Sequence, residues 1–304
     1  MKDGAQWQPV AGTSLEMALT DSADTEVFDT FFAGYDRAFV LPNEKEDRSG
    51  FAACLALNHG AAGARLATKH GPFAEICLIV RDAATKGPVG GANFLAVQVR
   101  GDEGTRISAN LNYIYVDAHS RGRGYFSAVI EAVRQAIRQA MGSNLDPLIF
   151  IELNDPFRMS AQDYARDTKF TGLDQLDRIR IWARYGARIV DFPYVQPALA
   201  PDSRADEALV YGLLSTEADL SACTLGDQLR KFFEISVLKG ELPHENTAAA
   251  NQLEALRLMC ANGKRIALLD PEPLVSLKGG RSEIEVRAGG PLRSVREALR
   301  LLGD

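Results

Sequence analysis

The sequence is poor in the patterns that would assign it to a specialised class of protein. Its four cysteines show no CxxC spacing, so they predict neither a zinc cluster nor a secreted disulfide framework, and a reduced cytoplasmic compartment fits best. Its four histidines lie far apart and form no HExxH pair, so we expect no metal site. The cysteines are Cys54, Cys77, Cys223 and Cys260, and the histidines are His59, His70, His119 and His244.

Long hydrophobic runs are also missing. The first ten residues, MKDGAQWQPV, contain no apolar signal segment, and no stretch approaches the roughly 20 apolar residues that cross a bilayer. We therefore expect neither a secretory signal nor a membrane partner.

The chain has fewer positively charged than negatively charged side chains. Thirty-four Lys and Arg stand against forty Asp and Glu, which gives a net charge of −6. A chain of this charge is poorly suited to nonspecific binding of phosphate backbones, so we do not expect nucleic acid as a partner. The remaining composition is that of an ordinary globular protein, with 46% hydrophobic and 24% charged residues, and 304 residues suffice for about two domains.

Between residues 25 and 117 the hydrophobic spacing predicts helices followed by an antiparallel meander. Apolar residues recur at helical spacing from Thr25 to Tyr35, and less regularly from Arg48 to His59. Three apolar runs, AEICLIVRD, ANFLAVQVR and ISANLNYIYVD, follow after residue 73 with turn signals between them. They predict three consecutive antiparallel strands.

A glycine loop and a long helix follow the third run, which ends at Asp117. The loop is AHSRGRG, and the segment YFSAVIEAVRQAIRQAM behind it has one apolar helical face. A short buried strand over 147–153, a helix over 173–185 and two closing strands complete this part. The rest is helical and ends with SVRE, a capping box. We therefore predict a domain of residues 1–215 and a mostly helical C-terminal extension of residues 216–304.

The loop has the composition of an anion-binding cradle. Gly122 and Gly124 allow a tight turn that exposes backbone N–H groups, and the next helix adds its unpaired N-terminal amides and the positive end of its dipole. The dipole alone stabilises an anion by only about 0.3–1 kcal/mol, so the charges of Arg121 and Arg123 are needed as well. The cradle suits a phosphate group.

Other interpretations of this loop are weaker or plainer. A Walker A loop needs Gly-Lys-Ser/Thr, and no lysine stands here. A dinucleotide fingerprint needs a third small residue where Ser127 stands, and it needs a parallel βαβ unit, whereas these strands are predicted antiparallel. The plain alternative is a glycine-containing connection with solvated arginines.

The order of these elements resembles the GNAT superfamily of N-acetyltransferases. Arg121-Gly-Arg-Gly124 between a strand and a long helix is similar to the family's Gln/Arg-x-x-Gly-x-Gly/Ala signature, from which Phe126 departs. A strand that ends in Asn154 and a helix that ends in Tyr185-Gly-Ala-Arg resemble the second family motif. The resemblance covers about residues 25 to 215.

The resemblance implies a fold and a cofactor. The fold is α/β, a GNAT-type mixed, mainly antiparallel sheet flanked by helices, with the C-terminal extension outside it. Acetyl-CoA or another acyl-CoA is the implied co-substrate, without a metal, in a V-shaped opening between the strands before and after the loop helix. Tyr115 and Val116 would bind the pantetheine arm, the Val116 N–H would polarise the thioester carbonyl, and Asn154 would contact the arm. The pyrophosphate would be held by the backbone of Arg121, Gly122, Arg123, Gly124, Tyr125 and Phe126.

Two departures from the family pattern bear on the chemistry. Trp182 stands where many members have the tyrosine that protonates the departing thiolate, and an indole cannot supply that proton. Tyr185 is then the candidate for this acid, with a packing aromatic as the plain alternative. Asn110 stands near the position where some relatives carry a glutamate, and an amide is no base.

A base is needed because an alkylamine with a pKa near 10.4 is almost fully protonated at pH 7. Alternation along PLIFIELN places Phe150, Glu152 and Asn154 on one face of a strand. Glu152 is therefore the first candidate for the base and Glu75 the second. A solvated or salt-bridged strand residue is the plain alternative for Glu152.

The connection DPFRMSAQDYARDTKFTG after Asn154 is longer than the family's usual one. Loops of this length tend to be functional, so we expect it to cover the acceptor site, with Asp163 and Asp167 placed to attract a cationic amine. Tyr194 would line the same cleft. Solvated loop charges are the alternative for each aspartate.

Together, the residues and the resemblance predict an acyltransferase that moves an acetyl or another short acyl group from acyl-coenzyme A to an amine by direct attack in a ternary complex. A small molecule or a peptide would supply the amine, and a homodimer is compatible with the extension. Trp182 and Asn110 favour the alternative of a non-catalytic acyl-coenzyme A sensor or structural module. Transfer to a hydroxyl group is a third hypothesis.

Overall fold

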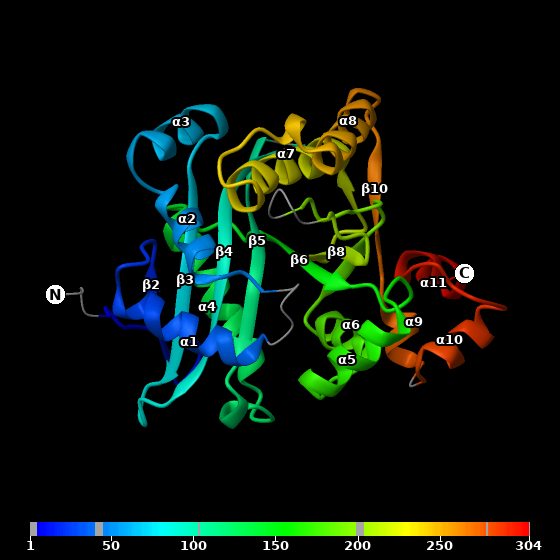
Figure 1. The fold of residues 1–304 in the computed structure, drawn as a ribbon, viewed down its shortest axis with the longest axis horizontal. Coiled ribbons are helices and arrows are strands. Elements are labelled where there is room, and N and C mark those ends of the chain that lie inside the picture. Colours follow the sequence, from blue (N-terminus) through cyan, green and yellow to red (C-terminus); the bar gives the residue numbers. More distant parts are fainter. Residues whose placement is uncertain (1–4, 40–44, 103, 199–203, 278, 304) are drawn as a thin grey trace. The chain divides into compact units, whose positions relative to one another are not determined.

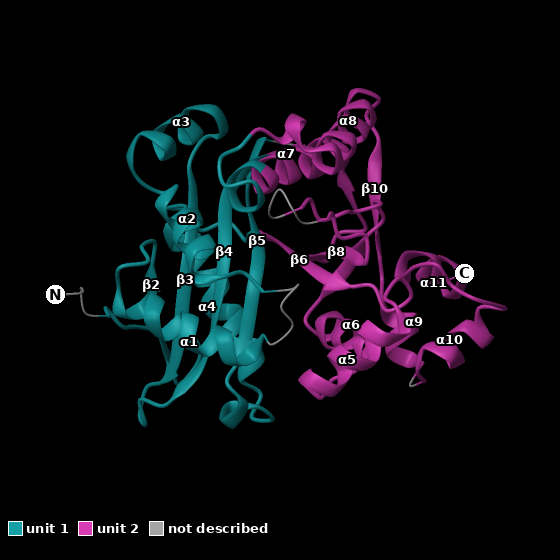
Figure 2. Ribbon diagram, in the orientation of Figure 1, with its two compact units in different colours: residues 1–99, 104–147, 234–241 teal, residues 100–103, 148–233, 242–304 magenta. Residues whose placement is uncertain are grey.

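The computed structural model describes residues 5–39, 45–102, 104–198, 204–277 and 279–303. The chain forms two compact units (Figure 2): unit 1 contains residues 1–99, 104–147 and 234–241, and unit 2 contains residues 100–103, 148–233 and 242–304. One short segment of the C-terminal third, residues 234–241, thus belongs to unit 1. The predicted boundary between residues 215 and 216 concerns where the family resemblance ends, and it stays a prediction.

Unit 1 is built on a sheet with strand order β1-β2-β3-β4-β5 (Figure 1). The β1–β2, β2–β3 and β3–β4 pairs are antiparallel, and the predicted meander corresponds to the last three strands. The mainly antiparallel α/β fold predicted from the sequence is therefore confirmed. The strands are β1 (Gln8–Pro9), β2 (Leu15–Thr20), β3 (Phe73–Asp82), β4 (Pro88–Gly101) and β5 (Gly104–Val116).

Helices cover both faces of this sheet. In Figure 1, α1 and α2 lie in front of the strands of unit 1 and α4 lies behind them. The predicted first helix is confirmed, and Thr25 is its N-cap, because the Thr25 side chain accepts a hydrogen bond from the Phe28 N–H. The helices are α1 (Glu26–Ala38), α2 (Arg48–Ala56), α3 (Gly60–His70) and α4 (Tyr125–Ala140).

An aromatic core joins α1 and α2 to the front face of the sheet. Phe28, Phe31 and Tyr35 of α1 are fully buried and pack against Phe51 of α2. The ring of Tyr115 belongs to the same cluster, and its Oη donates to the Phe31 carbonyl at 3.1 Å. Tyr115 therefore turns its side chain toward α1.

Glycines permit the close approach of α1 to β5. A Cβ at Gly34 would lie 2.2 Å from the Tyr115 Oη, and one at Gly91 would lie 2.8 Å from the same atom. No side chain fits at either position without displacing the tyrosine ring.

The strands of unit 2 follow the order β6-β8-β7-β10-β9, and each neighbouring pair is antiparallel. The predicted buried strand before Asn154 is confirmed, whereas the following strand at ARIVDFPYV ends at Val190, before Pro193. The strand β10 was not predicted. The strands are β6 (Leu148–Asn154), β7 (Ala187–Val190), β8 (Leu209–Leu214), β9 (Asp219–Ser221) and β10 (Arg265–Leu269).

The helices of unit 2 include the predicted last helix with its capping box, in which the Ser294 Oγ accepts from the Glu297 N–H at 3.1 Å. They are α5 (Ala161–Thr171), α6 (Gln175–Arg184), α7 (Ala222–Phe232), α8 (Thr247–Ala261), α9 (Glu272–Ser276), α10 (Arg281–Arg287) and α11 (Val295–Leu302). Among the described residues, no helix has the length and apolar character needed to cross a membrane.

One cysteine pair departs from the sequence-based expectation. Cys223 of α7 and Cys260 of α8 form a disulfide, whereas the spacing of the cysteines predicted none. The two residues are 37 positions apart, and only the packing of α7 on α8 brings them together. Cys54 and Cys77 are buried free thiols in unit 1.

We predict that Gly34→Ala destabilises unit 1 by up to about 2 kcal/mol. Overpacking against the Tyr115 ring costs about 1–3 kcal/mol, and the better helix propensity of alanine offsets about 1 kcal/mol of it. Urea unfolding measures the difference. The matched control is the same substitution in a Tyr115→Leu background, where the methyl group meets no ring and should be neutral or stabilising; equal destabilisation in both backgrounds would contradict the packing explanation.

Candidate functional site

The loop between β5 and α4 is anchored at its beginning. Asp117 accepts the His119 N–H at 3.1 Å and opens a single 3-10 turn, Ala118–Ser120. The Ser120 Oγ donates to the Pro88 carbonyl of β4 at 3.0 Å, and the Asp117 N–H donates to the Val89 carbonyl at 2.8 Å. These bonds hold the start of the loop against the sheet.

The rest of the loop leaves its backbone amides open. Gly122 and Gly124 have φ values of 75° and 76°, in the left-handed region that glycine adopts without strain. In the described part of the chain, the N–H groups of Gly122, Arg123, Gly124 and Tyr125 donate to no protein acceptor, and no side chain caps α4. A Cβ at either glycine would meet no atom within 4 Å, so no other part of the described chain covers these two residues on that side. Open amides of this kind are what the predicted anion cradle requires, and its binding of an anion stays a prediction.

Positive charge flanks the cradle. Arg121 and Arg123 are exposed, and neither forms an ion pair with a carboxylate of the described residues. The Arg121 Nε donates to the Val116 carbonyl at 3.3 Å, which ties this side chain to the end of β5. Both guanidinium groups thus keep their charge available to an anion.

The predicted residues at the end of β5 can act only through their backbone. The Tyr115 side chain is buried against α1, and this burial raises the pKa of its hydroxyl well above the usual range. Val116 is the last residue of the strand. Tyr125 begins α4 and Phe126, which is half-buried, follows it.

The remaining predicted residues lie in unit 2. Glu152 and Asn154 are on β6, where Glu152 pairs with Tyr211 and Asn154 with Leu209 of β8. The predicted opening between β5 and β6 involves one strand of each unit, and it stays a prediction.

Aromatic rings surround Glu152. The Tyr194 Oη donates a hydrogen bond to the Glu152 carboxylate, and the Tyr194 ring stacks on Tyr211 with centroids 4.7 Å apart. Tyr211 in turn stacks on Phe150 at 5.1 Å. Burial raises the pKa of both tyrosines, so both hydroxyls stay protonated. Glu152 is half-buried and hydrogen-bonded to Tyr194, and the choice between a base and a solvated or salt-bridged strand residue stays open.

Tyr185 follows the end of α6. It is the half-buried C-cap residue, its N–H donates to the Trp182 carbonyl at 3.0 Å, and the next residue, Gly186, has φ 83°. Trp182 itself is buried. Both residues lie in unit 2, whereas the cradle lies in unit 1.

The connection after Asn154 differs from the predicted loop. Its second half is the helix α5, capped by Ser160, whose side chain accepts from the Asp163 N–H at 3.1 Å. Asp167 is buried and paired with Arg178 at 2.9 Å, and Tyr194 is likewise buried. The expectation that Asp167 attracts an amine from solution is therefore wrong, because its carboxylate is buried and already paired with Arg178 inside unit 2.

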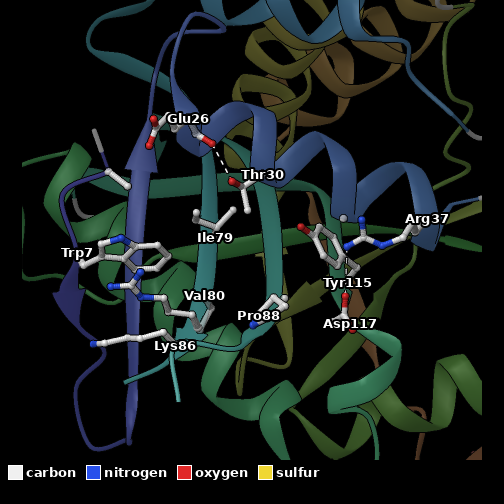
Figure 3. A pocket seen from close by; sticks show the side chains of 14 residues that line it. Trp7, Glu26, Thr30, Arg37, Ile79, Val80, Lys86, Pro88, Tyr115 and Asp117 are labelled. Atoms are coloured by element: carbon white, nitrogen blue, oxygen red, sulfur yellow. Dashed lines mark hydrogen bonds and ion pairs between the residues drawn. The ribbon is translucent and has the colours of Figure 1, made fainter. Parts of the chain in front are cut away.

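A cavity of about 370 Å³ in unit 1 was not predicted (Figure 3). It lies beneath α1, and both neighbours of Val116, Tyr115 and Asp117, line it. The Arg81 guanidinium lies 3.5 Å from the centroid of the Trp7 ring at one end, and Arg37 lies 3.4 Å from Asp117 at the other. The only sign of this cavity in the sequence is Trp7, a tryptophan in a polar N-terminal segment. The cavity thus borders the end of β5 that the resemblance assigns to the cofactor arm.

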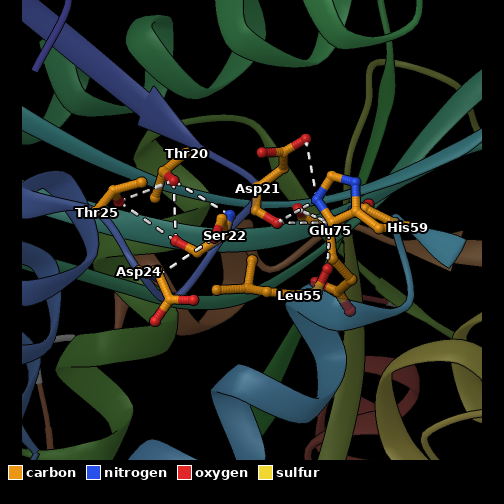
Figure 4. A network of polar contacts seen from close by, with 9 residues as sticks. Thr20, Asp21, Ser22, Asp24, Thr25, Leu55, His59 and Glu75 are labelled. Atoms are coloured by element: carbon orange, nitrogen blue, oxygen red, sulfur yellow. Dashed lines mark hydrogen bonds and ion pairs between the residues drawn. The ribbon is translucent and has the colours of Figure 1, made fainter. Parts of the chain in front are cut away.

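Glu75, the second candidate for the base, is fully buried in β3. The Asn58 side chain holds its backbone, accepting from the Glu75 N–H at 2.9 Å and donating to the Glu75 carbonyl at 2.8 Å (Figure 4). The Ser236 Oγ, from the segment 234–241, donates to its carboxylate. Burial raises the pKa of Glu75 to about 7.

Metal ligands do not gather in the described ranges: no three His, Cys, Asp or Glu side chains there lie together as a metal site requires.

We predict that Glu75→Gln changes the pH dependence of stability. Because the pKa of Glu75 rises from 4.5 in the unfolded chain to about 7 in the folded one, the folded state holds the proton more tightly, and stability falls as pH rises between these values. The glutamine variant should match the wild type near pH 5 and exceed it by up to about 3 kcal/mol at pH 8. Denaturant unfolding across this range tests it, with Glu26→Gln on the exposed side of α1 as the control. A constant difference at every pH would refute the assignment.

No family model and no curated protein matches the chain. Among solved structures, the chain is similar to the ribosomal-protein-S18-alanine N-acetyltransferase from Escherichia coli (16% identity, 65% of this chain, 92% of that one, TM-score 0.32). It is also similar to a spermidine N-acetyltransferase chimera from Vibrio cholerae and hSSAT (11% identity, 66% of this chain, 95% of that one, TM-score 0.35). A third similar structure is that of an aminoglycoside acetyltransferase from an uncultured soil metagenomic sample (24% identity, 46% of this chain, 79% of that one, TM-score 0.27). At identities of 24% or less and TM-scores of 0.35 or less, these three likenesses carry no conclusion about activity.

Proposed function

We propose that the protein transfers an acetyl or another short acyl group from acyl-coenzyme A to an amine by direct attack in a ternary complex. The observation that carries this proposal is the open cradle: four consecutive amides, from Gly122 to Tyr125, without a protein acceptor at the N-terminus of α4. Such a row of donors beside two unpaired arginines suits a diphosphate.

The cradle assigns roles to this chain's residues. The backbone from Arg121 to Phe126 would hold the pyrophosphate, and the backbone of Tyr115 and Val116 would receive the pantetheine arm. The bound acyl-coenzyme A supplies a thioester as the activated acyl group. The Val116 N–H would polarise its carbonyl, and Asn154 would contact the arm. No metal is needed for this reaction, because backbone donors can stabilise the developing oxyanion.

Proton transfer is the second requirement. An amine attacks only in its neutral form, so a carboxylate must accept its proton, and a group of higher pKa must protonate the departing thiolate. Glu152 is the candidate base in unit 2, and Tyr185 the candidate acid. Glu75 is the alternative base in unit 1, where a pKa of about 7 suits general-base work near neutral pH.

One specific observation favours a second function, that of a non-catalytic acyl-coenzyme A sensor. Trp182 stands where the family's acid is expected, and it is buried. A thiol-release assay with a panel of amines separates the two functions. Tight coenzyme A binding with no turnover on any amine would support the sensor.

We predict that Gly124→Glu abolishes coenzyme A binding, with an affinity loss of more than about 100-fold, because a carboxylate would enter the cradle and repel the pyrophosphate. Isothermal titration calorimetry measures the affinity. Gly142→Glu is the matched control, since Gly142 follows the opposite end of α4 with φ 57° and equally open space. Both variants carry the same charge and backbone strain, so retained micromolar affinity in Gly124→Glu would remove the cradle.

We further predict that removing the base lowers kcat/KM by about 10²–10⁴-fold and abolishes the acidic limb of the pH–rate profile. Glu152→Gln and Glu75→Gln are compared, with Glu131→Gln on α4 as the control. The variant that loses the limb identifies the base. If both keep the wild-type profile, neither carboxylate accepts the amine proton.

A further inference from the structure

A continuous line of polar side chains crosses the sheet of unit 1 from β3 to β5. Glu75, Asn93 and Asn110 are 0%, 3% and 0% exposed, and Asn112 is half-buried. Burial of such groups without a purpose costs stability, because apolar side chains in their place would need no partners. A row of them in an interior is therefore a sign of function.

The hydrogen bond that Asn93 makes to β3 sets the orientation of each side-chain amide along this line. The Asn93 Nδ2 donates to the Ile76 carbonyl at 3.1 Å, and a carbonyl can only accept. The Asn93 Oδ1 must then face β5, where it accepts from the Asn112 Nδ2 at 3.0 Å. The Asn112 Oδ1 in turn accepts from the Asn110 Nδ2 at 2.9 Å. The Asn112 amide is thus held in a single orientation.

The carboxylate of Glu75 lies at the β3 end of this line. Ser236 donates to it from the segment 234–241, and the nearby Asn93 lowers the pKa of Glu75, which burial raises. The Asn93 Nδ2 also lies 3.6 Å from the Cys77 Sγ of β3. Asn93 is therefore held by β3 on one side and by Asn112 of β5 on the other.

Asn112 retains unused hydrogen-bonding capacity. A primary amide has two N–H donors and two acceptor positions on its oxygen. The contacts with Asn93 and Asn110 use one of each, and among the described residues Asn112 has no others. One donor and one acceptor, side by side on a partly exposed side chain, are left for a ligand.

The position of Asn112 along β5 says which ligand would meet it. The strand passes Asn110 and Asn112 before it reaches Tyr115, Val116 and the cradle. An arm that starts at the cradle and follows β5 backwards points its thioester toward Asn112. Val116 and Asn112 are four residues, or about 13 Å, apart in an extended strand, a distance that the body of an acceptor molecule can span.

We propose that Asn112 binds the acceptor substrate through an uncharged group that both donates and accepts a hydrogen bond, such as a hydroxyl or a primary or secondary amide. Asn93 is a positioning residue that fixes the Asn112 amide. This inference rests on the proposed function, since it needs the thioester at the cradle end of β5. It names a class of acceptor: amines that carry a hydroxyl or amide at some distance from the reacting nitrogen.

The test uses the full-length protein and matched amines. We compare 6-aminohexanol and 6-aminohexanamide with hexylamine, which lacks the polar group, in wild type and in Asn112→Ala and Asn112→Asp. Wild type should favour the polar acceptors about tenfold in kcat/KM, and both variants should lose this preference through KM, with hexylamine and coenzyme A affinity unaffected. Asn93→Ala should lose part of it, because the Asn112 amide is then free to rotate. Thr105→Ala, at the exposed start of the same strand, is the control.

Two results would overturn the inference: a wild type without preference for the polar acceptors, or variants that change all three amines equally. Calorimetric binding of the same amines to coenzyme A-saturated protein reports on Asn112 without turnover. A wild type that binds 6-aminohexanol through Asn112 but releases no thiol would contradict the proposed transfer and leave the binding role standing. Turnover that is the same in wild type and in the Asn112 variants would contradict only the binding role.

Discussion

The left-handed backbone at Gly122 and Gly124 is the constraint on which the candidate site depends. Because both residues have positive φ, the chain between β5 and α4 turns without bonding its own amides, and the first amides of the helix stay uncapped. The anchors at Asp117 and Ser120 hold the loop to β4. An anion that binds there meets donors already in place, so little conformational entropy is lost on binding.

The interior of unit 1 is the second feature that sets this protein apart from a plain α/β domain. Glu75, Asn93 and Asn110 are buried in the sheet of unit 1, whose front face carries the aromatic core of α1 and α2. The segment 234–241 adds two polar side chains: the Ser236 Oγ donates to the Glu75 carboxylate, and the Glu234 carboxylate lies 3.0 Å from the His70 Nε2. A segment distant in sequence thus completes the polar interior of the unit that holds the cradle.

Elements with a strong local pattern could be predicted, and those without one could not. The aromatic spacing of α1, the meander and the amphipathic α4 all follow from periodicity that a single segment carries. The helix α3 was missed because GAAGARLATKH contains two glycines and few apolar residues, and α5 was taken for a loop because polar residues dominate it. The strand β10 is five residues long and pairs with β7 and β9, which are far away in the chain.

The sequence by itself determined the strand, the glycine loop and the helix that form the cradle, because glycine is the residue that adopts positive φ without strain and helical periodicity is local. Only the tertiary structure decided which side chains share an environment. It buried Glu75 and Asp167, it placed Tyr194 on Glu152, and it joined Cys223 to Cys260. These contacts depend on segments that are distant in the chain and meet only when the sheets and helices pack, so no local pattern records them.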